Sequence, residues 1–162
     1  MILITDVDNC FVSCERRRNP ELEGKPVIVL SAGEAAVIAR SNEAKQLGIA
    51  MGEPYFKMKG RFSPGQYIAL PADHHYYKQV SDELMAMLRE ECPDLHQYSI
   101  DEAFADMAGV TTDLKKWGEQ LHLKIRERVG LPVSIGIAPS KTLPNAIPPT
   151  ATAASSTPTS GA

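Results

Sequence analysis

The stretch Ser99-Ile100-Asp101-Glu102-Ala103-Phe104 decides the fold, because it places two adjacent carboxylates between two short apolar runs. A second acidic stretch, Asp6-Val7-Asp8, follows the first apolar run of the chain. Adjacent carboxylates at the tip of a β-hairpin repel each other unless a cation lies between them and a third partner, and a divalent metal ion does this best. We therefore interpret Asp6, Asp101 and Glu102 as metal ligands.

The elements around these acids follow one recognisable order. The sequence predicts a strand over 2–5, an amphipathic helix over 76–91, strands over 96–100 and 103–107, a helix from Thr111 or Thr112 to Gly130, and a strand over 131–138. This order predicts an α+β, ferredoxin-like fold. In that fold the first strand ends at the same sheet edge as the turn between the second and third strands. Asp6 and Asp101-Glu102 are therefore expected to converge.

Residues 20–72 resemble a small insertion rich in Gly and Pro. Ahead of it, residues 10–15 have the spacing of a helix packed on a sheet, and Pro20 cannot continue that helix. Inside it we expect a strand over 27–30, an apolar stretch over 35–39 and a short helix over 40–48 that closes at Gly48. From Pro144 to Ala162 the chain has no charge and almost no large apolar side chain, which predicts disorder.

The composition predicts one soluble domain with an insertion. The 162 residues carry a formal net charge of -3, so any nucleic-acid role must come from local patches rather than from the overall charge. No apolar run approaches the roughly 20 residues of a membrane helix, and no basic leader precedes the first strand, so we expect a cytoplasmic protein without a membrane partner. Cys10, Cys14 and Cys92 are odd in number and lack zinc-type spacing, so we interpret them as reduced thiols.

Three converging carboxylates suit a site for two Mg²⁺ ions about 4 Å apart, which clamp the attacking and leaving oxygens of a phosphoryl displacement. The backbone carbonyl of Val7 is a further oxygen ligand for such ions. The plainer alternative is that Asp101 and Glu102 are solvated turn residues and Asp6 is a helix cap. That alternative suits any single acid better than the converging set. The pattern favours phosphoryl or nucleotidyl transfer, and the sequence has no Gly-x-x-x-x-Gly-Lys segment for a P-loop mechanism.

A metal-bound triphosphate also needs cations, and the candidates are Arg40, Lys45 and Lys141. Each of them alone is more often a solvated surface charge. Phe11 lies five residues after Asp6, near enough for its ring to line the sugar of a bound nucleotide. A buried core ring is an equally good interpretation of Phe11.

Several ordered segments resemble a known family, over residues 1 to about 143. They are Asp6–Glu15, Gly24–Leu30, Val37–Arg40 with Glu43–Lys45, Tyr98–Phe104, and Gly136–Ala138 with Ser140–Leu143. Together they resemble the N-terminal part of Y-family translesion DNA polymerases, and within that family the catalytic subunit of bacterial SOS polymerase V and its plasmid-borne relatives. Asp8 stands where those relatives often have Asn, and Phe11 stands where they have Tyr.

The resemblance implies template-directed addition of a deoxynucleotide to a primer 3′-hydroxyl, with primer-template DNA and deoxynucleoside triphosphates as partners. It implies a palm formed by residues 1–19 and 73–143 and fingers formed by residues 20–72. An SOS accessory subunit and a recombinase filament are further implied partners. The implied residue roles are two Mg²⁺ ions held by Asp6, Asp101, Glu102 and the Val7 carbonyl, a steric gate against ribonucleotides at Phe11, triphosphate contacts from Arg40 and Lys45, and a DNA or nucleotide contact from Lys141.

The family pattern continues into a lysine-bearing helix, a thumb and a little-finger domain, whereas the stretch from Pro144 looks like a frameshifted or spliced terminus. Three interpretations stay open. The first is a palm and fingers module with an intact catalytic site. The second is a catalytically silent fragment that binds only nucleotide or metal. The third is another metal-dependent nucleotidyl enzyme on a palm-like sheet, such as a nucleotide cyclase, and the fingers segments argue against it.

Overall fold

The computed structural model describes residues 1–139, which form two compact units. One unit comprises Met1–Asp8 and the described residues from Lys78 on, and the other comprises Asn9–Tyr77. Compactness alone does not assign a role to either unit, so the division into palm and fingers stays a prediction. The predicted contact residue Lys141 and the predicted disorder from Pro144 lie outside the described residues.

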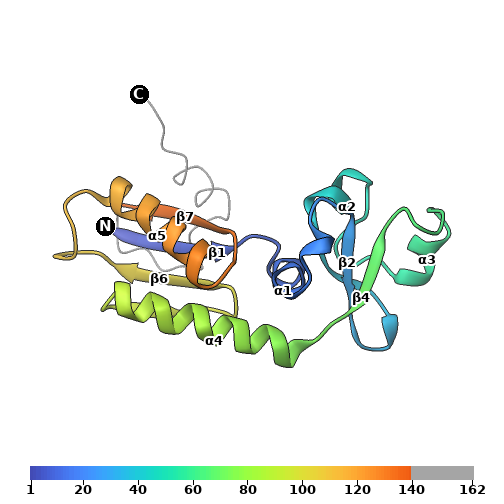
Figure 1. Ribbon diagram of the computed structural model, residues 1–162, viewed down its shortest axis with the longest axis horizontal. Helices are drawn as coiled ribbons and strands as arrows, with labels where there is room; N and C mark the ends of the chain where they lie inside the picture. The colour runs from blue at the N-terminus through green and yellow to red at the C-terminus, as the bar shows by residue number, and fades with distance from the viewer. Residues whose placement is uncertain (140–162) are drawn as a thin grey trace. The chain divides into compact units, whose positions relative to one another are not determined.

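The first unit contains a four-stranded antiparallel sheet (Figure 1). Its strands are β1 (Ile2–Val7), β5 (Leu95–Gln97), β6 (Glu102–Asp106) and β7 (Val133–Ala138), in the spatial order β5-β6-β1-β7. Helix α4 (His74–Glu91), which enters this unit at Lys78, and helix α5 (Leu114–Arg128) complete the order strand, helix, strand, strand, helix, strand. Because β6 lies antiparallel between β1 and β5, the predicted ferredoxin-like α+β fold is confirmed.

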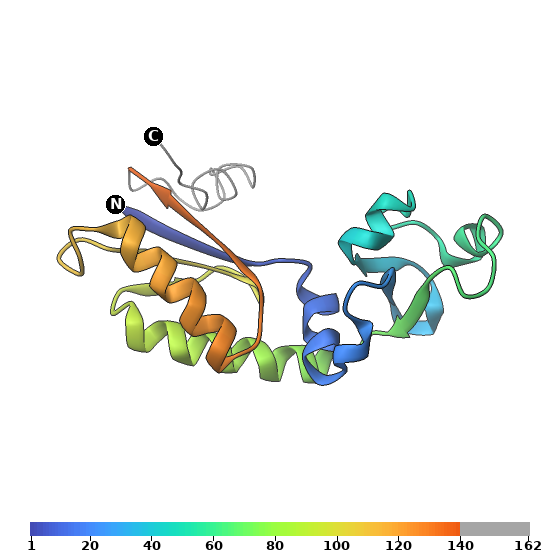
Figure 2. The ribbon, with the colours of Figure 1, turned by 45° about the horizontal axis from the view of Figure 1, so that its top comes forward.

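Helix α4 buries the apolar face that its amphipathic sequence predicts. On α4 the side chains of Val80, Leu84, Met87 and Leu88 are at most 2% exposed, and each such burial stabilises the fold by about 1.5–3 kcal/mol. Helix α5 packs on β7, as Figures 1 and 2 show. Their approach is close at Gly118, where an added Cβ would lie 3.7 Å from Cγ2 of Ile135.

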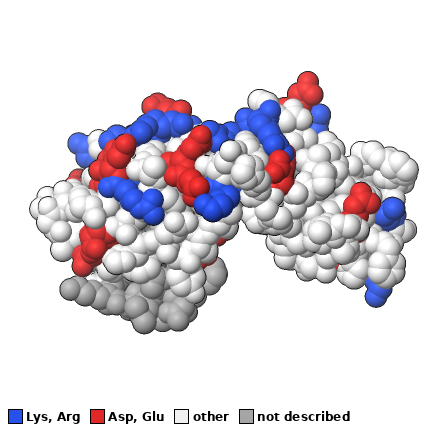
Figure 3. Space-filling view, turned by 90° about the horizontal axis from the view of Figure 1, so that it is seen from below, with Lys and Arg blue, Asp and Glu red and all other residues white. Residues whose placement is uncertain are grey.

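The surface of this unit around α4 and α5 carries charges of both signs. The ion pairs are Lys78–Asp82 at 3.0 Å, Lys124–Glu91 at 3.3 Å and Arg128–Glu90 at 3.1 Å. Figure 3, which views the molecule from the α4 side, shows basic and acidic side chains interleaved there. Interleaved charges give this face no single sign to attract a polyanion. Within residues 1–139 no helix is both long and apolar enough to cross a bilayer.

The second unit is a three-stranded sheet with short helices around it. Its elements are α1 (Cys10–Arg18), β2 (Val27–Leu30), β3 (Val37–Arg40), α2 (Asn42–Gln46), α3 (Tyr55–Lys59) and β4 (Ile68–Pro71), with 3-10 turns at Pro20–Leu22 and Ala32–Glu34. The sheet order is β3-β2-β4, with β2 antiparallel to β3 and parallel to β4. Helix α1 lies against β2 and β3, so the predicted helix on a sheet is confirmed. The core consists of Ile28, Leu30, Val37, Ala44, Ile49 and Met58.

Several predicted boundaries are wrong. Helix α5 is capped by Asp113, not by Thr111 or Thr112, because the Asp113 carboxylate accepts the backbone N–H of Lys116 while the Thr111 hydroxyl accepts that of Asp113. Strand β5 ends at Gln97, earlier than predicted, and Glu102 is the first residue of β6 rather than a turn residue. Strand β4 and helix α3 were not predicted, since such short elements show too little periodicity to be recognised.

Candidate active site

The three predicted metal ligands meet at one edge of the four-stranded sheet. Asp6 lies directly opposite Glu102 in the register of β1 and β6, and Asp101 precedes Glu102 in the chain. One carboxylate oxygen from each of Asp6, Asp101 and Glu102 lies within 4.8 Å of the other two. The predicted convergence is thereby observed, and residues far apart in the sequence share one cluster.

Backbone hydrogen bonds fix the position of this cluster. The N–H groups of Tyr98 and Ser99 both donate to the carbonyl of Glu102, at 2.9 and 3.1 Å, which closes the hairpin tightly. The N–H of Val7 donates to the carbonyl of Asp101 at 3.0 Å, so the end of β1 is tied to the hairpin. The metal-ligand role of the Val7 carbonyl itself stays a prediction.

The electrostatics of the cluster disfavour its fully charged form. Partial burial, together with the neighbouring carboxylates of Asp101, Glu102 and Asp8, raises the pKa of Asp6 from 3.8 to about 7. Burial and the Asp101 carboxylate also raise the pKa of Glu102. A divalent cation would remove both penalties, because it replaces lost hydration and offsets the mutual repulsion.

Three serines that the sequence analysis did not single out support the acidic cluster. The Ser99 hydroxyl donates to Oδ1 of Asp101 at 2.8 Å, and the Ser134 hydroxyl donates to Oδ1 of Asp8 at 2.6 Å. The Ser81 hydroxyl on α4 donates to the carbonyl of Ile100. Only Ser134 had a usable signal in the sequence, since it is a small polar residue within a β-branched strand.

The donor set fits a hard divalent cation. All three side chains offer carboxylate oxygens, which Mg²⁺ and Ca²⁺ prefer, and the cluster contains neither His nor Cys. Each of the three is partly exposed, so an ion would retain water ligands there. The structure therefore supports the predicted metal site by ligand chemistry and by distance.

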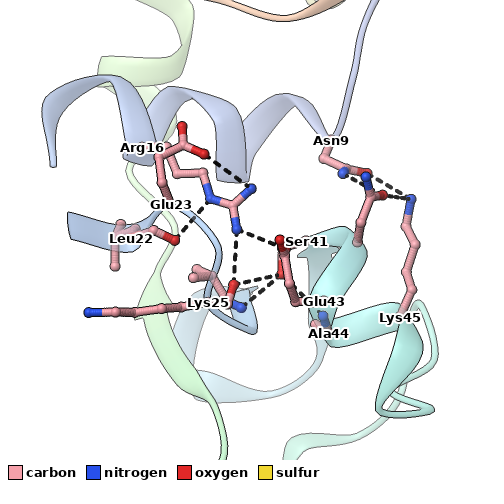
Figure 4. A network of polar contacts seen from close by, with 11 residues as sticks. Asn9, Arg16, Leu22, Glu23, Lys25, Ser41, Glu43, Ala44 and Lys45 are labelled. Atoms are coloured by element: carbon pink, nitrogen blue, oxygen red, sulfur yellow. Dashed lines mark hydrogen bonds and ion pairs between the residues drawn. The ribbon is translucent and has the colours of Figure 1, made fainter. Parts of the chain in front are cut away.

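The predicted triphosphate cations belong to the second unit and differ in their surroundings. Lys45 on α2 is exposed, and its ammonium donates to Oδ1 of Asn9 at 2.7 Å (Figure 4). The Asn9 amide in turn donates to Oδ1 of Asn42 at 3.0 Å. Arg40 is partly buried, its guanidinium donates to the carbonyl of Ile49, and its Nε has no hydrogen-bond partner among the described residues. Lys45 is thus available to a ligand, whereas Arg40 already has a structural contact.

A partly buried cation holds α2 in place. The Arg16 guanidinium on α1 donates to the carbonyls of Leu22 at 3.1 Å and Lys25 at 2.9 Å, and to the Glu43 carboxylate at 2.9 Å (Figure 4). The Arg16 contact lowers the pKa of Glu43. Because Glu43 and Lys45 belong to the same short helix, Arg16 indirectly orients the Lys45 ammonium.

Phe11 is half-buried on α1 and contacts two other rings. Its ring stacks on Tyr77 with centroids 4.6 Å apart and an interplanar angle of 16°, and it meets His74 edge-on at 5.6 Å. A ring supported on one side and partly exposed on the other can form a rigid wall. The steric-gate role of Phe11 stays a prediction.

Comparisons with known proteins identify the family. The impB/mucB/samB family matches residues 5–145 of this chain. Protein UmuC of Salmonella typhimurium is 43% identical over 88% of this chain and 34% of its own length. The chain therefore spans about a third of the length of that curated relative.

Two solved structures have the same fold. An insertion ternary complex of Dbh DNA polymerase matches with a TM-score of 0.78 at 28% identity, covering 87% of this chain and 43% of that one. A Y-family DNA polymerase chimera of Dbh and Dpo4 matches with a TM-score of 0.77 at 29% identity, with the same coverage of 87% and 43%. The chain belongs to the impB/mucB/samB family of Y-family DNA polymerases.

Proposed function

We propose that this chain carries the catalytic site for template-directed nucleotidyl transfer in translesion DNA synthesis, with two Mg²⁺ ions as cofactors. The observation that carries the proposal is the meeting of the Asp6, Asp101 and Glu102 carboxylates within 4.8 Å. A cluster of three acids with one pKa raised to about 7 is costly unless a cation occupies it. Such a cost is typical of functional sites.

Asp6, Asp101 and Glu102, assisted by the Val7 carbonyl, would hold the ions. When bound there, two divalent ions would activate the primer 3′-hydroxyl and stabilise the charge that develops on the triphosphate. The protein contributes by holding the carboxylate ligands in position. The hairpin hydrogen bonds to the Glu102 carbonyl and the Val7 contact with Asp101 keep the carboxylates together before any substrate arrives.

The second unit would supply the nucleotide contacts. The exposed Lys45 and the partly buried Arg40 would bind the triphosphate. Lys141, which lies outside the described residues, would contact DNA or the nucleotide. The Phe11 ring, held against Tyr77, would exclude a ribose 2′-hydroxyl by bulk. An SOS accessory subunit and a recombinase filament remain partners implied by resemblance alone.

Primer extension tests the catalytic proposal. The chain is incubated with a primer-template, deoxynucleoside triphosphates and Mg²⁺, and is compared with Asp101→Asn. Asp106→Asn is the matched control, because Asp106 lies at the other end of β6. Extension by the parent chain and by Asp106→Asn, but not by Asp101→Asn, supports the proposal. Extension that survives in Asp101→Asn contradicts it.

A second candidate function is binding of nucleotide and metal without extension. The acidic cluster favours it, because three converging carboxylates would hold a divalent cation whether or not DNA is bound. Mg²⁺-dependent binding of a deoxynucleoside triphosphate, measured by calorimetry in the absence of DNA, combined with no extension, supports this candidate.

A further inference from the structure

Helix α3 presents an aromatic ring to solvent. Met58 is fully buried in the core, while Phe56, two residues earlier, is 74% exposed. Residues two apart point to nearly opposite sides of a helix, so burial of Met58 forces Phe56 outward. The exposed fraction of Phe56 exceeds those of the other large hydrophobic side chains in the described part of the chain, such as Met51 at 55% and Leu123 at 59%.

Three further rings, close to α3 in the sequence, are fixed on the core. Tyr55, Phe62 and Tyr67 are half-buried and pack against the cluster that contains Met58. Tyr67 meets Tyr55 and Phe62 edge-on, with centroid distances of 6.4 and 6.1 Å, and the two tyrosine hydroxyls lie 3.4 Å apart. These rings therefore keep their orientation without a ligand, which lowers the entropic cost of stacking on them.

The exposed ring of Phe56 and the half-buried rings of Tyr55 and Phe62 each have a cation beside them. The ammonium of Lys57 lies 5.9 Å from the Phe56 ring, that of Lys59 lies 5.2 Å from Tyr55, and the guanidinium carbon of Arg61 lies 5.0 Å from Phe62. We call this surface the aromatic-basic patch, and it comprises Tyr55, Phe56, Lys57, Lys59, Arg61 and Phe62.

Two acids lie near the patch: Glu34, whose charge acts on the Tyr55 hydroxyl, and Glu53, which Arg61 neutralises. Both carboxylate oxygens of Glu53 accept from the Arg61 guanidinium, and the Glu53 side chain is only 17% exposed. Lys57 and Lys59 are exposed and have no ion pair among the described residues. The patch therefore has a local positive charge on a chain whose formal net charge is -3. In Figures 1 and 2, α3 lies at the end of this unit remote from α1, so the patch is separate from the Phe11 ring.

We propose that the aromatic-basic patch binds single-stranded DNA, such as the unpaired template strand. Cations contact phosphates, and rings stack on bases whose faces are free only in a single strand. An acidic peptide would use the cations but not the rings, and duplex DNA hides its base faces. The inference rests on the proposed function only in taking DNA as the partner.

Fluorescence anisotropy with a labelled oligo-dT of about ten nucleotides tests the patch. The measurement uses the full chain in EDTA, so that it does not depend on the acidic cluster. Phe56→Ala is compared with Leu123→Ala, which removes an exposed apolar side chain from α5. The double variant Lys57→Gln/Lys59→Gln is compared with Lys115→Gln/Lys116→Gln, which has the same charge change on α5.

Phe56→Ala should weaken oligo-dT binding at least about fivefold, because one stacked base is lost. The lysine variant should reduce the slope of log affinity against log salt by about 1.4, at about 0.7 per phosphate contact on a single strand. The α5 variants should bind like the parent chain. Heparin, a polyanion without bases, should bind Phe56→Ala as well as it binds the parent chain.

Equal losses in the patch and α5 variants would overturn the proposal, as would unchanged oligo-dT binding by Phe56→Ala. Parallel losses for heparin and oligo-dT in Phe56→Ala would also overturn it, since they would indicate a charge effect without stacking. Asp101→Asn should retain full oligo-dT binding. That result separates the patch from the catalytic proposal, which primer extension and Mg²⁺-dependent nucleotide binding test independently.

Discussion

Asp6 and Glu102 stand directly opposite each other on neighbouring antiparallel strands, in the register that also pairs Thr5 with Ala103. Like charges in this arrangement destabilise a sheet, and the adjacent Asp101 adds to the repulsion. The fold tolerates this cost because hairpin and β1 hydrogen bonds hold the backbone on both sides. Removing one of these charges should therefore release part of the repulsion.

Replacing Asp6 by Asn is expected to raise the stability of the metal-free protein at neutral pH. The pKa of Asp6 in the folded protein is about 7, above its ordinary value of 3.8. Below the ordinary value, Asp6 is protonated in both the folded and the unfolded chain, so its charge costs no stability. Between the two values only the unfolded chain loses the proton, so the free energy of unfolding falls as pH rises, and the full loss is present above the higher value. After allowance for partial solvent screening, Asp6→Asn should gain about 1–3 kcal/mol at about pH 8 and almost nothing near about pH 3.5.

Thermal denaturation in EDTA at the two pH values measures this gain. Glu119→Gln, an exposed change on α5, is the control and should leave the melting temperature unchanged. A gain from Asp6→Asn of the same size at both pH values would show that the carboxyl is not destabilised by its charge.

Mg²⁺ is expected to raise the melting temperature, and to raise it more above pH 7 than below. A ligand that binds only the folded chain stabilises it by mass action, and protons compete with the ion for Asp6, whose pKa is about 7. Differential scanning fluorimetry with and without millimolar Mg²⁺ measures the effect. Asp101→Asn should abolish it, whereas Asp106→Asn should not. An equal rise in both variants would place the bound ion outside the acidic cluster.

Much of this arrangement could be predicted from the sequence, because the order of elements fixes which strand ends share a sheet edge. Asp6 and Asp101 were placed together on that ground alone. The support from Ser81 could not be predicted, since its contact with Ile100 joins distant elements that no local pattern encodes. Ser134 carried only the signal of a small polar residue in a β-branched strand, which does not reveal Asp8 as its partner. Helix α3 was missed because its five residues give no usable periodicity, although it presents Phe56 to solvent.

Replacing Lys45 by Gln and replacing Arg40 by Gln are expected to have different effects, the first on nucleotide binding and the second on stability. Lys45→Gln should weaken binding of a deoxynucleoside triphosphate without altering unfolding, because its exposed ammonium donates to the side-chain amides of the partly exposed Asn9 and the exposed Asn42. Arg40→Gln should lower the stability by about 1–2 kcal/mol, because it leaves the carbonyl of Ile49 without this donor. Calorimetric titration and urea denaturation give the two readouts. A stability loss in Lys45→Gln would identify its contacts as structural instead.

Tyr77→Phe is expected to destabilise the protein by about 1–3 kcal/mol while leaving sugar selection intact. The Tyr77 hydroxyl donates to Oε2 of Glu15 at 2.6 Å, and Glu15 is only 5% exposed. The variant would remove this donor from a buried carboxylate that also accepts from the Arg18 guanidinium at 3.0 and 3.1 Å. The phenyl ring that remains would still stack on Phe11.

Urea denaturation should show the loss as a lower midpoint with an unchanged slope, and Tyr98→Phe, at a side chain that is 52% exposed, should change the midpoint little. Competition between a ribonucleotide and its deoxy analogue should then distinguish the role of the stacked rings from that of the Tyr77–Glu15 hydrogen bond. Phe11→Ala should improve relative ribonucleotide binding about tenfold, because it removes the wall itself. A comparable improvement in Tyr77→Phe would mean that the Glu15 hydrogen bond, and not the stacked ring alone, holds Phe11 in place.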